Sequence, residues 1–285
     1  MNKEFEDQLI EFTNESLLED VKEGDHTSLS TIDEKAKGKA QIIAKEEGII
    51  AGVQVGLKMF QLIDPALQVK TFVKDGERVK ERQEVFQIEG SLHSILKAER
   101  LVLNVMQRMS GIATTTRSYV DLIKDTKARV LDTRKTTPLL RFLEKESVKI
   151  GGGVNHRFGL YDMILVKDNH IDFAGGITAA LSKVYDYLKD KNLNIPVEVE
   201  VRDFQELNEV IDFGKVDRIL LDNFTPEDTR KAVDKIGGSF ILESSGGINK
   251  STILAYAKTG VDYISVGGLT HSVKSLDLSL KAVVV

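Results

Sequence analysis

The 285-residue sequence contains no cysteine and no tryptophan, and only four prolines. The absence of cysteine excludes disulfides, thiolate metal sites, iron–sulfur clusters and a cysteine nucleophile, and it fits a reducing compartment. Long apolar runs are also missing, since the most apolar stretch, residues 48–57, is far shorter than a membrane span. The opening residues, MNKEFEDQLIEF, are acidic and amphipathic, unlike a secretory or mitochondrial leader. We therefore expect a cytoplasmic protein with no membrane partner.

Positive charge is in deficit, with 39 Lys and Arg against 44 Asp and Glu and a net charge of −5. This balance argues against nucleic acid as a partner, because binding to a phosphate backbone needs a positive surface. The deficit is uneven, however, since residues 127–167 hold nine basic and four acidic residues. This segment alone carries a charge of +5, and the rest of the chain carries −10.

The cations of this segment fall into two groups. Three at four-residue spacing predict a solvated basic helix face: Arg141, Lys145 and Lys149. Five other cationic groups lie at the edge of an apolar run or beside glycines, where a scaffold can hold them facing a ligand: Arg134, Lys135, His156, Arg157 and Lys167.

From residue 128 onward, short apolar runs alternate with amphipathic stretches of helical period. The runs cover residues 128–132, 162–166, 196–201, 217–221, 239–243 and 261–266. The last four recur every 21 to 23 residues, which is typical of β/α units with parallel strands buried on both faces. Six units are fewer than the eight of a closed barrel, so we expect an incomplete α/β barrel. An open doubly wound sheet is the alternative fold.

The first 110 residues follow a different pattern. The predicted elements are a helix over 4–20, strands on both sides of a turn near Glu47–Gly48, a helix to about Ile63, strands around an Asp75–Gly76 turn and a long helix over 93–123. We place the domain boundary near Ser110–Gly111. This gives an N-terminal α/β domain, residues 1–110, and a barrel domain, residues 111–270.

Two glycine pairs follow the last two predicted strands, in SSGGI (244–248) and VGGLTHS (266–272), and each precedes a helical pattern. Glycine pairs let backbone N–H groups approach an anion, and a following helix N-terminus adds a favourable partial charge. Loops after the last strands of a barrel often bind phosphate. The pairs therefore predict a phosphate site, with ordinary turn chemistry as the alternative.

The segment GGGVNHRFGLYDMILVKDNH (151–170) predicts a loop that wraps a ligand, because three glycines cannot hold a regular element. His156, Arg157 and Lys167 supply cationic donors, and arginine is suited to binding carboxylates through two hydrogen bonds. A surface loop with incidental charge is the alternative. Metal binding by His156 and His170 is less favoured, because the spacing of known histidine metal motifs is missing.

Glu198 and Glu200 alternate with valines, so both side chains face the same side of their predicted strand. Two acids inside a strand are costly unless something pairs with them. Together with Asp222 they could bind Mg²⁺, which prefers hard oxygen ligands and phosphate-bearing substrates. Internal ion pairs with nearby Lys and Arg are the alternative.

Seven segments together resemble the quinolinate phosphoribosyltransferase family, also called nicotinate-nucleotide pyrophosphorylase (carboxylating). They are AERLVLNVMQRMSGIAT (98–114), DTRKTTPLLR (132–141), the GGGVNHR loop with its following strand (151–171), VEVEV (197–201), LLDNF (220–224), ESSGGI (243–248) and VDYISVGGLTHSVKSLDLSL (261–280). The resemblance runs from about residue 24 to the C-terminus. It implies an N-terminal α/β sandwich, rejoined by the tail 271–285, and an open α/β barrel of the type II phosphoribosyltransferase kind.

The resemblance also implies an activity. Such an enzyme is a pentosyltransferase that converts quinolinate and phosphoribosyl pyrophosphate, with Mg²⁺, into nicotinate mononucleotide, pyrophosphate and CO₂ for NAD biosynthesis. Quinolinate would be held by Arg134, His156, Arg157 and Lys167, and by Arg100 from the partner in a homodimer or larger assembly. Phosphoribosyl pyrophosphate would be held by Lys135, Glu200, Asp222, Ser245, Gly246, Gly247, Gly267 and Gly268. The resemblance assigns the metal to Glu200 and Asp222, and the catalytic roles to these two with Lys135 and Lys167.

Three other functions fit parts of the same pattern. A related phosphoribosyltransferase could use nicotinate or another base, although the many cations favour a dicarboxylate. Lys167 at a strand end could instead form a Schiff base in an aldolase or isomerase barrel. A non-catalytic phosphate-binding protein is the third alternative.

Overall fold

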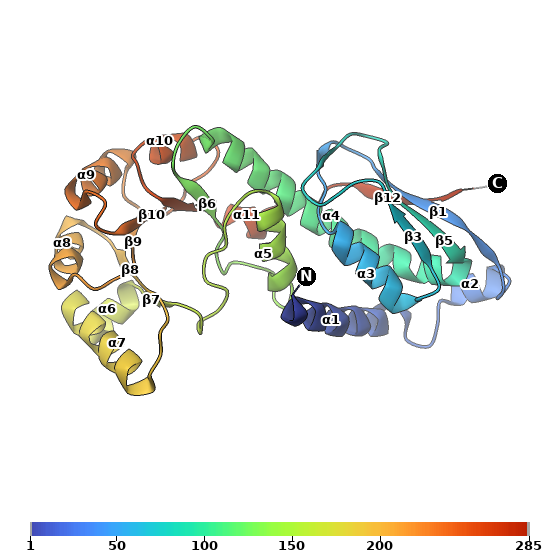
Figure 1. Cartoon of the computed structure of the whole chain (residues 1–285), viewed down its shortest axis with the longest axis horizontal. Helices are drawn as coiled ribbons and strands as arrows, with labels where there is room; N and C mark the ends of the chain where they lie inside the picture. The colour runs from blue at the N-terminus through green and yellow to red at the C-terminus, as the bar shows by residue number, and fades with distance from the viewer. Residues whose placement is uncertain (1, 284–285) are drawn as a thin grey trace. The chain divides into compact units, whose positions relative to one another are not determined.

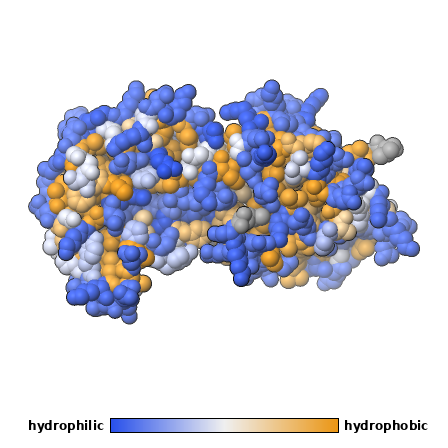
Figure 2. Space-filling model, in the orientation of Figure 1, coloured by the Kyte–Doolittle hydropathy of each residue, from blue (hydrophilic) through white to orange (hydrophobic). Residues whose placement is uncertain are grey.

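The computed structural model describes residues 2–283, which form two compact units (Figure 1). The first unit contains residues 2–117, 137–152 and 272–283, and the second contains residues 118–136 and 153–271. Hydrophilic side chains cover much of the visible surface of each unit, with apolar residues between them (Figure 2). Within residues 2–283, the helices include none that combines the length and apolar character needed to span a membrane.

The first unit is built on a four-stranded antiparallel sheet in the order β12-β1-β5-β3. Its strands are β1 (Lys37–Ala44), β3 (Gln68–Thr71), β5 (Glu84–Ser91) and β12 (Leu278–Val283). The last strand comes from the C-terminal part of the chain and pairs with β1 from Lys39 to Ala44. Phe60 and Phe86 meet edge to face at 6.1 Å in the core, where both are fully buried.

The longer helices of this unit lie close to the predicted positions, whereas the short helix His26–Thr31 was not predicted. They are α1 (Lys3–Val21), α2 (His26–Thr31), α3 (Val53–Ile63), α4 (Leu92–Ile123), whose last residues belong to the second unit, and α5 (Arg141–Ile150). Asp25 caps α2 by accepting a hydrogen bond from the backbone N–H of Ser28. Gly111 lies inside α4, where a Cβ atom would be 2.3 Å from the carbonyl oxygen of Lys274. This glycine allows the helix to pass close to the C-terminal segment.

Two details differ from the sequence expectations. The strand after the Asp75–Gly76 turn, β4 (Arg78–Val79), pairs with β2 (Gly48–Ile49) and not with β3 across the turn. Lys145 is 1% exposed, so the prediction of a solvated basic face on α5 is wrong for this residue. Regular spacing places residues on one side of a helix, but it does not reveal that other elements cover that side.

The second unit has six parallel strands in the order β6-β11-β10-β9-β8-β7. They are β6 (Arg129–Leu131), β7 (Ile164–Val166), β8 (Val197–Val201), β9 (Arg218–Asp222), β10 (Ile241–Ser245) and β11 (Tyr263–Ser265). Each strand falls within or next to one of the six apolar runs, so the parallel α/β fold predicted from the sequence is confirmed. β8 is buried along its whole length, as expected for a strand covered on both faces.

Helices follow the strands and lie outside the arc that the strands form (Figure 1). They are α6 (Asp168–Ala174), α7 (Ile177–Lys191), α8 (Phe204–Phe213), α9 (Pro226–Ile236), α10 (Ile253–Ala257) and α11 (Gly268–His271). β6 and β7 form the two edges of the sheet, and a single bridge joins Leu131 of β6 to Val154. The barrel is therefore open between β6 and β7.

Candidate active site

Parallel strands bring their carboxyl ends to one edge of the sheet, and most predicted site residues follow such an end in the second unit. Arg134 and Lys135 follow β6, Lys167 follows β7, and Glu200 lies near the end of β8. The remaining predicted residues lie at or after the ends of β9, β10 and β11: Asp222, Ser245, Gly246, Gly247, Gly267 and Gly268. The topology thus gathers residues that are more than 130 positions apart in the sequence.

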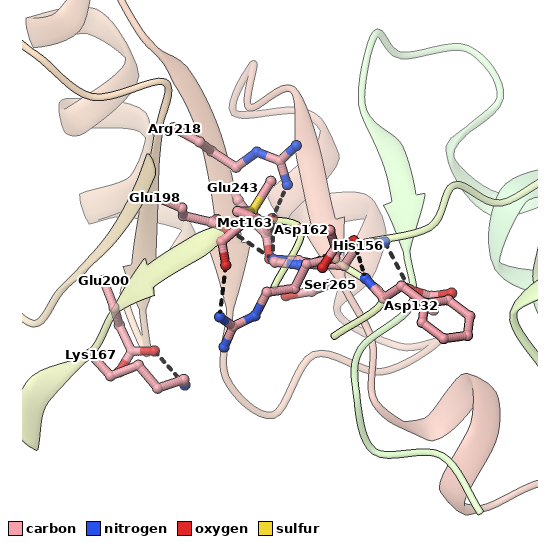
Figure 3. A network of polar contacts seen from close by, with 12 residues as sticks. Asp132, His156, Asp162, Met163, Lys167, Glu198, Glu200, Arg218, Glu243 and Ser265 are labelled. Atoms are coloured by element: carbon pink, nitrogen blue, oxygen red, sulfur yellow. Dashed lines mark hydrogen bonds and ion pairs between the residues drawn. The ribbon is translucent and has the colours of Figure 1, made fainter. Parts of the chain in front are cut away.

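Lys167, Glu200 and Asp222 form one cluster at this edge. The Lys167 ammonium lies 2.8 Å from Glu200 Oε2, and the Lys167 side chain is 46% exposed (Figure 3). Burial and the neighbouring charge of Glu200 raise the pKa of Asp222, while Lys167 lowers it. Two carboxylates in mutual repulsion favour a cation between them. Lys167 is paired with a carboxylate in this arrangement, which does not favour its use as a Schiff-base nucleophile.

The first glycine pair lies against Asn223, which follows Asp222. Gly246 has φ +104°, and a Cβ atom there would be 2.2 Å from Asn223 Oδ1 and 2.9 Å from its backbone nitrogen. Only glycine therefore fits this close approach. Asn223 in turn donates a hydrogen bond of 2.7 Å to Asp222 Oδ2, which links the glycine loop to the carboxylate cluster. The next helix, α10, begins only at Ile253, so it does not start directly after this glycine pair.

The second glycine pair lies next to Lys135. A Cβ atom on Gly267 would be 3.2 Å from Lys135 Cδ, and Thr270 Oγ1 donates a 2.8 Å hydrogen bond to the Lys135 carbonyl. Here the short helix α11 begins at Gly268 itself. The structure therefore brings Lys135 together with the predicted phosphate-binding glycines, which lie about 130 residues further along the chain.

The loop between Gly151 and β7 has no helix or strand among its described residues, as its glycines predict. Two buried or half-buried acids hold it in place. Asp132 Oδ1 accepts a hydrogen bond of 2.8 Å from the backbone N–H of His156. Asp162 accepts hydrogen bonds from the backbone N–H groups of Phe158 and Gly159, at 2.7 and 2.9 Å. The charged residues of the loop are thus carried by an ordered backbone.

Arg157 lies in this loop among charges of both signs. Its Nη1 donates a 3.2 Å hydrogen bond to the Met163 carbonyl. Burial lowers the pKa of the Arg157 guanidinium and the charge of Arg134 acts in the same direction, while Glu198 and Asp162 oppose them. The guanidinium groups of Arg134 and Arg157 therefore lie close enough to repel each other. Such an arrangement is typical of a site that binds an anionic ligand.

His156 joins the loop to a buried acidic cluster, which consists of Glu198, Glu243 and the guanidinium of Arg218. His156 Nε2 lies 3.0 Å from Glu198 Oε2 and 3.6 Å from Glu243 Oε2, and Arg218 Nη1 donates a 2.9 Å hydrogen bond to Glu243 (Figure 3). Burial raises the pKa of Glu198 and of Glu243 to about 7, and Glu198 adds to the rise at Glu243. Two buried carboxyl groups this close do not both ionise readily.

Among residues 2–283, His156, Glu198 and Glu243 are the group whose ligand atoms are spaced for a metal ion, within 4.8 Å of one another. The sequence favoured Glu200 and Asp222 instead. The guanidinium of Arg218 already supplies positive charge to this buried set. Glu200 and Asp222 lie at the more open edge, where a metal could also contact a substrate.

Arg100 is the one predicted site residue that belongs to the first unit. It is exposed on α4 and lines a pocket of about 330 Å³. The pocket is formed by α1, α4 and the start of α5, with lining residues that include Phe12, Glu19, Asp20, Asn104, Arg108 and Leu143. Arg108 pairs with the buried Glu144 at 2.8 Å, so the charge of Arg108 is compensated, whereas Arg100 presents its charge at the surface.

Comparison with known proteins identifies the family of this chain. The N-terminal domain model of quinolinate phosphoribosyl transferase matches residues 25–110, and the C-terminal domain model matches residues 112–281. The chain belongs to the quinolinate phosphoribosyltransferase family. Its family membership confirms the resemblance seen in the sequence motifs.

Individual family members are similar over nearly the whole chain. A decarboxylating quinolinate phosphoribosyltransferase 2b, mitochondrial, of Nicotiana tabacum is 44% identical over 272 residues, covering 90% of this chain and 77% of the relative. A probable nicotinate-nucleotide pyrophosphorylase (carboxylating) of Bacillus subtilis is 43% identical, covering 96% of this chain and 93% of the relative. The solved nicotinate-nucleotide pyrophosphorylase of Francisella tularensis has a TM-score of 0.91 and 41% identity, with 97% and 96% coverage.

Four residues beside the candidate site received no individual role from the sequence: Asp132, Asp162, Arg218 and Glu243. Arg218 and Glu243 each stand at the edge of an apolar run that forms a strand, which is an unusual place for an unpartnered charge. That position could have indicated a buried pair. The sequence could not show that the pair meets His156, because the contact joins β9 and β10 to a distant loop.

Proposed function

We propose that this chain transfers the phosphoribosyl group of phosphoribosyl pyrophosphate to quinolinate and releases CO₂, forming nicotinate mononucleotide and pyrophosphate for NAD biosynthesis. The observation that supports this most is that three features lie at one sheet edge. They are a cationic cluster (Arg134, Arg157 and Lys167), a carboxylate cluster (Glu200 and Asp222) and the two glycine loops. Each of these three features matches one chemical part of the substrate pair, as the following paragraphs argue. Membership of the quinolinate phosphoribosyltransferase family supports the same reaction.

The cationic cluster is proposed to hold the two carboxylates of quinolinate. Arg134 and Arg157 lie close enough to repel each other, and a dianion between them would relieve that repulsion. Lys167 follows β7, the strand that comes directly after the loop of Arg157 in the sequence, and it would contact the same ligand. His156 and the partner subunit's Arg100 complete the set that the family resemblance implies. A monocarboxylate would leave part of this positive charge unpaired, which favours quinolinate over nicotinate.

The glycine loops are proposed to hold phosphoribosyl pyrophosphate. Gly246 and Gly247 both have positive φ, so the chain turns sharply and can present backbone N–H groups to the 5′-phosphate. Ser245, Gly267 and Gly268 would add to that cradle. Lys135 lies beside Gly267 and would face the pyrophosphate. Glu200 and Asp222 would face the ribose and the metal.

The carboxylate cluster fits Mg²⁺ in donor type, because Glu200 and Asp222 are hard oxygen ligands that repel each other. We propose that these two residues hold the ion, directly or through water. When bound, Mg²⁺ would stabilise the charge of the departing pyrophosphate. Lys167 already balances part of the negative charge of Glu200, so this lysine would be shared between the carboxylate and the substrates.

The reaction has two bond-exchange steps. In the first, the pyridine nitrogen forms a bond to the anomeric carbon of the ribose as the bond to pyrophosphate breaks. In the second, the carbon–carbon bond to the carboxylate next to the nitrogen breaks, and its electron pair passes to the cationic ring. A proton then replaces CO₂ on the ring carbon. Since cations that hold the departing carboxylate oppose its loss, the site must stabilise the carbanion-like state more strongly than the bound dianion.

A CO₂-release assay tests this function directly. Incubation with carboxyl-labelled quinolinate, phosphoribosyl pyrophosphate and Mg²⁺ should yield labelled CO₂ and nicotinate mononucleotide in equal amounts. Nicotinate serves as the alternative acceptor in a parallel reaction. Formation of nucleotide from nicotinate, with no CO₂ from quinolinate, would show that the chain is a related phosphoribosyltransferase with another substrate.

We further propose that the enzyme is a homodimer or larger assembly, in which Arg100 serves the active site of the neighbouring subunit. Arg100→Ala and Lys167→Ala chains should each be inactive alone and partly active when mixed. Random pairing into dimers should restore about a quarter of the normal activity, because one of the two sites in each mixed dimer is intact. Size-exclusion chromatography checks that the variants still assemble. Mixtures that remain inactive would place Arg100 in the site of its own chain.

We also propose a cellular compartment for this chain. The plant relative named above carries the word mitochondrial in its name, and that word applies to the tobacco protein. For this chain we propose a cytoplasmic location, because the complete absence of cysteine fits a reducing compartment.

A further inference from the structure

The buried acidic cluster beneath the loop has no role in the proposed reaction. Glu198 and Glu243 are both 0% exposed, and Arg218 is held at Glu243 while its guanidinium lies 4.6 Å over the ring of Tyr263. Buried ion pairs are weak contributors to stability, since apolar residues of similar volume often serve as well. A fully buried pair of carboxyl groups inside a parallel sheet therefore calls for an explanation other than folding.

The contacts of His156 offer that explanation. His156 Nδ1 accepts a hydrogen bond of 2.6 Å from the backbone N–H of Arg157, so the ring hydrogen is assigned to Nε2. Nε2 then faces Glu198 Oε2 at 3.0 Å and Glu243 Oε2 at 3.6 Å. The backbone N–H of His156 is held by Asp132. The ring thus lies between the backbone of Arg157, which is hydrogen-bonded to Nδ1, and the acidic groups that face Nε2. Within residues 2–283, the buried oxygens of Glu198 have no hydrogen-bond partner.

We propose that Glu198 and Glu243 are positioning residues for quinolinate binding, which act by fixing the orientation and tautomer of His156 and, through it, the backbone of Arg157. This inference rests on the proposed function, because it assigns quinolinate to Arg157 and its neighbours. If the ring lost its acidic partners it could rotate or change tautomer. Its Nδ1 would then no longer accept from Arg157.

Displacement of Arg157 would weaken the binding of quinolinate, because Arg157 is one of the residues proposed to hold it. The Arg157 guanidinium is anchored by a single 3.2 Å hydrogen bond to the Met163 carbonyl, and its backbone N–H is held by His156. A shift of about 1 Å in a binding group is enough to cost large factors in catalysis. The expected effect falls on quinolinate alone, since the phosphoribosyl pyrophosphate residues Lys135 and Gly246 have separate supports.

Two substitutions at Glu198 separate positioning from folding. In Glu198→Gln an amide oxygen can still face His156 Nε2, and the amide N–H can donate to Glu243, with which Glu198 interacts directly. Glu198→Leu has similar volume but no acceptor. We expect the KM for quinolinate to rise about tenfold or more in Glu198→Leu and by less than about threefold in Glu198→Gln. The KM for phosphoribosyl pyrophosphate should stay within about twofold in both.

A spectroscopic measurement tests the same idea without activity. The chain has only five histidines, so the imidazole nitrogens can be resolved by ¹⁵N NMR, with His156→Gln used to assign the His156 signals. The substrate-free wild type and Glu198→Gln should show a protonated Nε2 and an unprotonated Nδ1 at His156. Glu198→Leu should show a changed tautomer ratio or ring averaging.

The matched control is Glu206→Gln on α8, which alters a half-buried acid paired with Arg202 and should change neither KM nor the His156 signals. Thermal unfolding checks that all variants fold. If Glu198→Leu does not fold, Glu243→Gln is used in its place. The amide N–H₂ introduced at position 243 would face a hydrogen-bond donor on Arg218 or His156 and could not accept from it.

Equal KM values in the Leu and Gln variants, a parallel rise in the KM values for both substrates, or an unchanged His156 tautomer would overturn the proposal. Failure of the wild type to use quinolinate would instead refute the proposed function, while the NMR result would still stand.

Discussion

Replacing Arg134 by alanine is expected to reduce kcat/KM for quinolinate by about a hundredfold or more, with little change in stability. A hydrogen bond from a charged donor contributes about 1.5–3 kcal/mol, and arginine can make two to one carboxylate. Arg134 follows β6 and is exposed, so its removal leaves no buried group without a partner. Steady-state kinetics and calorimetric titration with quinolinate would measure the loss.

The matched control for this prediction is Arg202→Ala, which removes an exposed arginine paired with Asp172 and Glu206 in the same unit. That variant should keep normal affinity for quinolinate. If Arg134→Ala also bound quinolinate with nearly normal affinity, the assignment of Arg134 to a substrate carboxylate would be wrong. A large fall in the melting temperature of Arg134→Ala would show that the residue has a structural role instead.

Gly246→Ala is expected to raise the KM for phosphoribosyl pyrophosphate about tenfold or more, because the loop cannot keep its conformation. The new Cβ would be 2.2 Å from Asn223 Oδ1 and 2.9 Å from the Asn223 backbone nitrogen, at a φ of +104°. Movement of Asn223 would also release its hydrogen bond to Asp222, so the metal-binding cluster would be disturbed together with the phosphate cradle. Kinetics with each substrate varied in turn would detect both effects.

Gly237→Ala serves as the control for the strain alone. Gly237 also has a positive φ, +57°, but it ends α9 with open space around the position of a Cβ atom. This variant should lose about 1 kcal/mol of stability and keep its activity. If Gly246→Ala behaved in the same way, the close approach to Asn223 would not be needed for phosphate binding.

The sequence predicted the second unit well because buried parallel strands leave a clear pattern. Each of the six apolar runs became a strand, and the polar residues after them met at one edge as the topology requires. The pattern contains no information on which distant groups share a buried contact. The pairing of Arg218 with Glu243, and of Glu243 with His156 in the loop, depends on strand order and loop conformation.

The first unit shows a different limit of prediction. Its helices and strands were found at nearly the right positions, but the pairing of β4 with β2 was missed, since a turn sequence marks a reversal and not the partner strand. Lys145 was expected in solvent and is buried. In both cases local pattern gave the element, and tertiary contacts decided its surroundings.

The position of β12 has a consequence for how the chain acquires its structure during synthesis. β1 leaves the ribosome early, but one of its two neighbours in the sheet is the strand that contains Val283, which faces Lys39. Contacts between such distant residues form slowly, and until then β1 exposes an unpaired edge. We therefore expect the nascent N-terminal sheet to depend on protection from aggregation until β12 has been synthesised, whereas β7 to β11 of the second unit pair with strands that follow directly in the sequence.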